Sequence, residues 1–147
     1  MTIDISVGKP TGVSIFLLEK ENTLKSKKTH SETELYNLMT DIVAYLDKND
    51  MLFDVNIYVN KKRYSTSEYN TDAEVKIGSA VMYQSDCEDP SECIEYCNKD
   101  ALTMTFEGPL YQALNYGNAG EELNKIFEKY GMYYEQGYAW SLSAYDI

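Results

Sequence analysis

Apolar residues recur three or four positions apart between Ser31 and Asp50 and form one stripe. Its members are Leu35, Leu38, Met39, Ile42, Val43 and Leu46. This spacing predicts an amphipathic helix with one buried face. Ser31 followed by Glu34 is a capping box, in which each side chain can satisfy a free backbone donor at a helix start. The helix is expected to end between Asp47 and Asp50.

Alternation of apolar and polar residues predicts strands further along the chain. Residues 53–59 place Phe, Val, Ile and Val at every second position, which is typical of a strand with one buried face. The polar residues 60–62 predict a turn into a second strand that runs through Tyr64. In residues 75–83 the valine, isoleucine and tyrosine side chains fall at odd-numbered positions, which predicts one further strand. Residues 102–106 predict the next strand, which ends at a Gly-Pro pair.

Helix-start and turn signals complete the predicted order of elements. Asp89 before Pro90 is typical of an N-cap followed by proline at the first helical position. Predicted helices cover residues 89–98, 110–116 and 121–130, and predicted hairpins cover 3–18 and 132–145. The last hairpin would place Tyr138 and Trp140 on one strand face. These elements predict a single α+β domain over residues 1–147, in which three to four helices pack on a mostly antiparallel sheet.

The charge of the chain is strongly negative and unevenly distributed. The formal net charge is −11, and residues 86–100 hold six carboxylates and one lysine. Such a field repels nucleic acid and anionic membranes and attracts basic proteins. No run of 18 apolar residues and no secretion signal is present, so we expect a cytoplasmic protein that binds neither membrane nor nucleic acid directly.

Tyrosine dominates the aromatic residues, with 14 Tyr against 4 Phe and 1 Trp. Tyrosine is enriched at recognition surfaces, although half-buried tyrosines are also common on the sheets of ordinary small domains. Together with the acidic stretch, the tyrosines predict a partner-binding surface. Its candidate residues are Asp86, Glu88, Asp89, Glu92, Glu95, Tyr96, Tyr133 and Tyr138.

All three cysteines fall within the acidic stretch. Cys93 and Cys97 would share one face of the predicted helix, and Cys87 would precede its N-terminus, where a thiolate is favoured. A tetrahedral zinc ion would need a fourth ligand, for which the candidates are Asp86, His30 or a cysteine of another copy. The alternatives are core cysteines packed beside Ile94 and Ala101, a disulfide, or reactive thiols. The expected cofactor is therefore none, or one structural zinc ion.

The remaining sequence offers little for catalysis. His30 is the single histidine, and no nucleophile elbow, phosphate-binding loop or dinucleotide fingerprint is present. Glu107 and Glu135 would make a glycosidase-like carboxylate pair only if the fold brought them together. We therefore expect a binding protein that is not an enzyme. The alternative is a small zinc- or thiol-dependent enzyme that uses the three cysteines, either alone or with His30.

In size, charge and tyrosine content the chain resembles small acidic inhibitors encoded by phages and mobile elements of Gram-positive bacteria. Residues 105–111 and 138–145 are similar to the corresponding parts of hypothetical proteins of such elements. Among these inhibitors, the resemblance is to anti-CRISPR proteins that act on type II nucleases. It implies an inhibitor in the bacterial host cell that binds a basic surface of the nuclease and blocks nucleic-acid loading. The other expectation is an acidic immunity- or antitoxin-type partner of another nucleic-acid enzyme.

Overall fold

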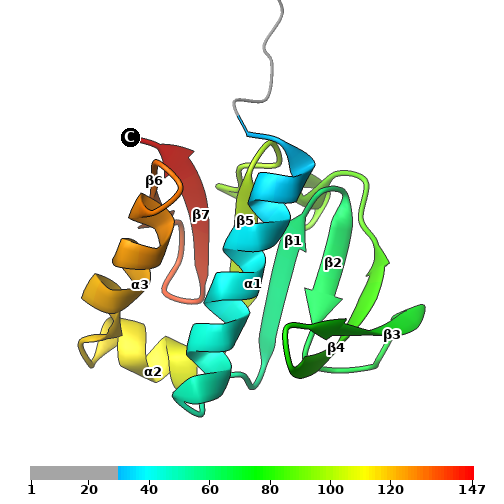
Figure 1. The fold of residues 1–147 in the computed structure, drawn as a ribbon, viewed down its shortest axis with the longest axis horizontal. Coiled ribbons are helices and arrows are strands. Elements are labelled where there is room, and N and C mark those ends of the chain that lie inside the picture. Colours follow the sequence, from blue (N-terminus) through cyan, green and yellow to red (C-terminus); the bar gives the residue numbers. More distant parts are fainter. Residues whose placement is uncertain (1–29) are drawn as a thin grey trace, which may run out of the picture.

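The computed structural model describes residues 30–147, which form a seven-stranded antiparallel sheet with three helices on one face (Figure 1). The elements are α1 (Glu32–Lys48), β1 (Val55–Val59), β2 (Lys62–Ser65), β3 (Ala73–Ile77), β4 (Ala80–Asp86), the 3₁₀ turn η1 (Pro90–Glu92), β5 (Leu102–Phe106), α2 (Pro109–Asn115), α3 (Ala119–Glu128), β6 (Met132–Gln136) and β7 (Ser141–Asp146). The strand order is β3-β4-β2-β1-β5-β7-β6. The predicted α+β class and antiparallel sheet are confirmed. The predicted hairpin at residues 3–18 lies outside the described residues.

Helix α1 is the predicted amphipathic helix and crosses in front of the central strands (Figure 1). All six residues of its apolar stripe are fully buried. The Ser31 hydroxyl accepts a hydrogen bond from the Glu34 amide at 3.0 Å, which confirms the N-cap. The Glu34 carboxylate contacts the ring of His30. None of the helices in residues 30–147 is both long and apolar enough to cross a membrane.

The first hairpin follows the predicted alternation. Val55, Ile57 and Val59 are buried on the helix side of β1. The turn residues Asn60 and Lys61 have φ angles of 54° and 62°, the left-handed pair that a two-residue turn needs to match the twist of its strands. The predicted second strand through Tyr64 is therefore confirmed as β2.

Residues 75–83 form two strands, so the prediction of one strand is wrong. Gly78 adopts φ 63° and reverses the chain between β3 and β4. The turn pairs Ile77 with Ala80, so odd positions of β3 share a face with even positions of β4. Val81 consequently lies on the face opposite to Val75, although the sequence pattern gives the two residues the same parity.

The prediction of a helix over residues 89–98 is also wrong. Asp89 does act as an N-cap, since its carboxylate accepts from the Ser91 amide at 3.0 Å, but only the 3₁₀ turn η1 follows. Tyr96 has φ 61°, which is incompatible with a continuing right-handed helix. Cysteine, tyrosine and asparagine are weak helix formers, and contacts with the sheet replace the internal bonds of a helix here. The connection between β4 and β5, residues 87–101, includes η1 and is called the 87–101 segment below.

The 87–101 segment packs on the sheet face that the helices leave uncovered. Met104 and Leu142 pair in register and face the helices, so the neighbouring pair Thr103 and Ser143 faces the other way. Thr103 and Ser143 are nevertheless only 1% exposed. The segment covers them through a chain of hydrogen bonds. The backbone N–H of Asn98 donates to Thr103 Oγ1 (3.0 Å), and the hydroxyls of Thr103 and Ser143 bond to each other at 2.8 Å. The Ser143 hydroxyl also donates to the backbone carbonyl of Tyr96 (3.1 Å).

The C-terminal part follows the predicted order, with one correction. Helices α2 and α3 form where expected, and Gly131 after α3 has the left-handed φ of 76°. Strand β7, however, begins at Ser141, whose hydroxyl accepts from the Tyr138 amide at 3.0 Å. Tyr138 and Trp140 therefore lie in the tight turn between β6 and β7, not on a strand face as the alternation predicted.

Candidate binding surface

Three of the six carboxylates in the acidic stretch are paired with lysines. Lysine ammonium groups lie 2.6 Å from Asp86, 3.4 Å from Glu88 and 3.8 Å from Asp89. Their partners are Lys62, Lys61 and Lys99 respectively. Exposed pairs of this kind add little stability, but each cancels most of the local field of its carboxylate. The concentrated negative charge expected from the sequence is therefore reduced at these three sites.

Glu92 and Glu95 are exposed and form no ion pair with any side chain of residues 30–147. Glu95 instead accepts a hydrogen bond from the hydroxyl of Tyr138, which is 43 positions away in the sequence. The Tyr138 ring lies 5.4 Å from the ring of Tyr96 and stacks on Trp140 at 4.9 Å and 9°. The fold thus joins the 87–101 segment to the β6–β7 turn through aromatic rings and a carboxylate.

A cleft of about 440 Å³ opens between these two parts of the chain. Its lining consists of Tyr96, Glu135, Gln136, Gly137, Tyr138 and Tyr145, and we call it the aromatic cleft. The ring of Tyr145 lies 6.0 Å from that of Tyr133. Of the predicted partner-binding residues, Glu95, Tyr96, Tyr133 and Tyr138 lie in or beside the cleft, whereas Asp86, Glu88 and Asp89 engage lysines elsewhere.

Gly137 explains how the two walls of the cleft approach so closely. A Cβ atom at position 137 would lie 2.8 Å from the Cβ of Tyr96, a distance at which the backbone or Tyr96 must move. Gly137, Glu135 and Tyr145 were not among the residues predicted to form the partner-binding surface. The sequence does show Gly137 in a predicted turn next to aromatic residues. It does not show which distant segment of the chain contacts that turn.

The carboxylates make the potential in and beside the cleft negative. The charge of Glu135 raises the pKa of Tyr133 above its ordinary value. The hydrogen bond to Glu95, followed by partial burial, raises the pKa of Tyr138. Both hydroxyls therefore stay protonated at neutral pH, and the rings present neutral π faces next to negative charge.

The surroundings of Cys87 and Cys97 disfavour the thiolate form. Burial raises the pKa of Cys87, with a contribution from Cys93, and burial followed by the charge of Asp89 raises the pKa of Cys97. The expectation of a thiolate at a helix start is therefore wrong, because no helix forms and the thiols lie near carboxylates. Cys93 is exposed and shares no helix face with Cys97.

The residues proposed as zinc ligands do not form one group, although Cys87 lies near Cys93. Within residues 30–147, no three side chains of the types His, Cys, Asp or Glu are grouped so that they could hold a metal ion. His30 contacts Glu34 and Asp146, at the start of α1 and the end of β7. Glu107 lines a separate polar cavity with residues of β1 and β2, so it does not pair with Glu135 as a glycosidase would require.

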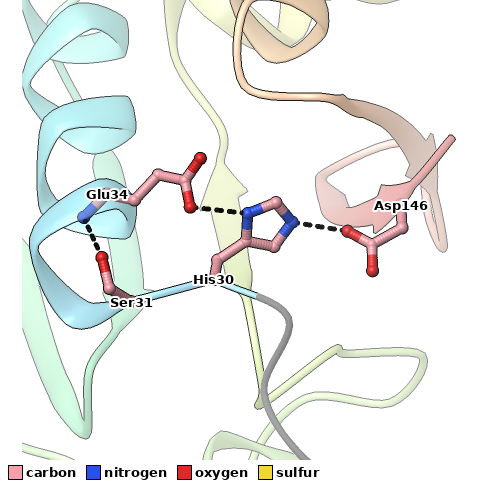
Figure 2. Close-up of polar contacts among 4 residues, drawn as sticks. All are labelled: His30, Ser31, Glu34 and Asp146. Atoms are coloured by element: carbon pink, nitrogen blue, oxygen red, sulfur yellow. Dashed lines mark hydrogen bonds and ion pairs between the residues drawn. The ribbon is translucent and has the colours of Figure 1, made fainter.

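His30 bridges two carboxylates (Figure 2). Its Nδ1 lies 2.9 Å from Glu34 and its Nε2 lies 2.6 Å from Asp146. Because a carboxylate only accepts, both contacts are hydrogen bonds when the imidazole carries both protons. Burial lowers the pKa of His30, but the hydrogen bonds to Asp146 and Glu34 outweigh it and raise the pKa above 6.5.

This bridge predicts a pH-dependent contribution to stability. A raised pKa in the folded state means that the contribution is complete below pH 6.5 and is lost as the pH rises through the folded-state pKa. We expect about 1 kcal/mol, since charge-assisted bonds are strong but both carboxylates are partly exposed. Denaturation of the wild type and of His30→Gln between about pH 5.5 and 8.5 measures this difference. Parallel pH profiles for the two proteins would contradict the prediction.

Comparison of the chain with protein-family models, with curated protein sequences and with solved structures finds no match.

Proposed function

We propose that the chain is a non-enzymatic binding protein that engages a basic surface of a nucleic-acid-handling protein. One observation carries the proposal: the fold gathers aromatic rings into one surface with carboxylates that have no lysine partner among residues 30–147. That surface consists of the aromatic cleft together with Glu95 and Trp140. A basic groove holds a polynucleotide by stacking on its bases and by attracting its phosphates. Aromatic rings placed next to carboxylates present the same two features to such a groove.

The partner that we propose is a type II CRISPR nuclease, whose loading of guide or target nucleic acid the bound protein would block. This choice is supported by the resemblance of the chain to anti-CRISPR inhibitors and by its net charge of −11. Long-range attraction between the acidic protein and a basic groove would accelerate association at low ionic strength. The place of action would be the cytoplasm of the bacterial host.

Charge reversal on this surface tests the proposal. The variant Glu95→Lys/Glu135→Lys is compared with Glu107→Lys/Glu128→Lys, which changes two exposed carboxylates at the ends of β5 and α3. Each reversal adds two positive charges, so both variants carry the same net charge of −7 instead of −11. We expect the surface variant to lose affinity for the purified nuclease about tenfold or more, and the matched variant about threefold at most.

The measurement is the dissociation constant across a salt series. Wild-type affinity should fall as the salt concentration rises, because screening weakens attraction between exposed charges. Absence of binding at every salt concentration would exclude this partner. Equal losses in the two variants would show that net charge, not the location of the carboxylates, determines binding, and would contradict the proposed surface.

A further inference from the structure

The aromatic cleft is built from three parts of the chain that meet away from the helices. Tyr96 comes from the 87–101 segment, Tyr138 from the β6–β7 turn and Tyr145 from β7. The Tyr138 ring is held at two points, by Trp140 stacked on it at 4.9 Å and by the hydrogen bond from its hydroxyl to Glu95. A ring fixed in this way offers a preformed face to a ligand and loses little freedom on binding.

The chemistry of the cleft favours a cation. The faces of tyrosine rings are negative, and they attract ammonium and guanidinium groups within about 6 Å. Glu135 contributes a carboxylate to the lining, which contains no basic side chain. Glu95 adds a second carboxylate behind Tyr138. The raised pKa of Tyr133, caused first by the charge of Glu135, reports the same negative potential.

We propose that the aromatic cleft binds the guanidinium group of an arginine presented by a partner protein. The inference rests on the proposed function, because it names the side chain that the basic partner would insert. A guanidinium is planar, stacks on aromatic rings and donates two parallel hydrogen bonds to a carboxylate, whereas an ammonium is compact and strongly hydrated. The volume of about 440 Å³ lies within the range of small-molecule sites and accommodates an arginine side chain.

The chain does not supply this arginine from its own sequence. Arg63 is its single arginine, and the guanidinium donates to the carbonyls of Tyr69 and Asn70 at 3.3 and 3.0 Å. Arg63 lies on β2, which is separated from β7 by β1 and β5 in the sheet. An arginine in the cleft therefore has to come from another molecule.

Two matched tripeptides test the inference without any assumption about the partner. Acetyl-Gly-Arg-Gly-amide is titrated into the protein and compared with acetyl-Gly-citrulline-Gly-amide, which has nearly the same shape but no charge. Backbone amide resonances in ¹H–¹⁵N spectra identify the binding site. We expect saturable shifts at Tyr96, Gly137, Tyr138 and Tyr145 with the arginine peptide, and binding about fivefold or more weaker with the citrulline peptide.

A pair of conservative variants separates the role of Glu135 from that of total charge. Glu135→Gln should weaken binding of the arginine peptide about fivefold or more, whereas Glu128→Gln on α3 removes one equally exposed charge and should leave it unchanged. The same spectra show whether each variant is folded. Shifts elsewhere on the surface, equal affinity for both peptides, or no saturable shift at all would overturn the inference.

The outcome is distinguishable from that of the proposed function. If the nuclease binds in the charge-reversal experiment but the arginine peptide does not, the binding surface stands and the arginine site is wrong. If the peptide binds in the cleft but the nuclease does not bind at any salt concentration, the arginine site stands and the proposed partner is wrong.

Discussion

Replacement of Phe127 with alanine is expected to lower the free energy of unfolding by about 3–5 kcal/mol, the usual cost of removing a buried phenylalanine. Phe127 is fully buried on α3, and its ring lies 5.5 Å from that of Tyr134 on β6. Truncation removes apolar contact and leaves a cavity between the helix and the sheet. Domains of this size unfold with about 5–15 kcal/mol in total, so this single change removes a large fraction of the stability.

Chemical denaturation of the wild type and the variant measures this loss. Ile126→Ala is the matched control, since Ile126 is the next residue of the same helix but is only partly buried. Its truncation should cost about 1–2 kcal/mol, in proportion to the smaller apolar area it removes from water. Equal costs for the two variants would contradict the packing of α3 on β6.

Replacement of Asn98 with alanine is expected to release the 87–101 segment from the sheet. The Asn98 side chain donates to the Ala144 carbonyl at 2.7 Å and accepts from the Asp100 amide at 3.2 Å. Loss of the first bond leaves the carbonyl of the buried residue Ala144 without that donor. This should lower the free energy of unfolding by about 1–3 kcal/mol. Tyr96, two residues away, would lose its fixed position, so binding at the aromatic cleft should weaken as well.

Thiol labelling and amide hydrogen exchange detect this release. Cys87 and Cys97 are half-buried in the wild type and should react faster in the variant. Asn124→Ala is the control, because among residues 30–147 its side-chain amide bonds only to the exposed Glu128 side chain of the same helix. Unchanged labelling rates in Asn98→Ala would show that other contacts anchor the segment.

Local patterns were sufficient for the elements that a single periodicity dominates. The stripe of α1 and the alternation of β1 and β5 appear in the sequence because each element buries one face, and burial alone selects apolar residues there. The roles of Ser31 as helix N-cap and of Gly131 as the left-handed residue after α3 could also be predicted, since both depend only on neighbouring residues.

Two of the wrong assignments have different origins, a local turn in one case and contacts with distant residues in the other. Residues 75–83 keep one parity in the sequence, but the reversal at Gly78 divides them between two strands. Asp89 and Pro90 do start a turn, but Asn98 bonds to Thr103 and to the carbonyl of Ala144, 46 positions away. A helix over residues 89–98 would have to give up these bonds with the sheet.

The sequence by itself determined the net charge of −11, the excess of tyrosine and the places where carboxylates and aromatics concentrate. Only the tertiary structure decided which of these groups act together. Strand β7 lies beside β5, and the 87–101 segment folds over both, so Glu95 meets Tyr138 while Asp86 and Glu88 are paired with lysines of β2 and the turn before it. Charge is a property of composition, whereas a binding surface depends on distances between residues far apart in the chain, and those distances follow from sheet order and packing.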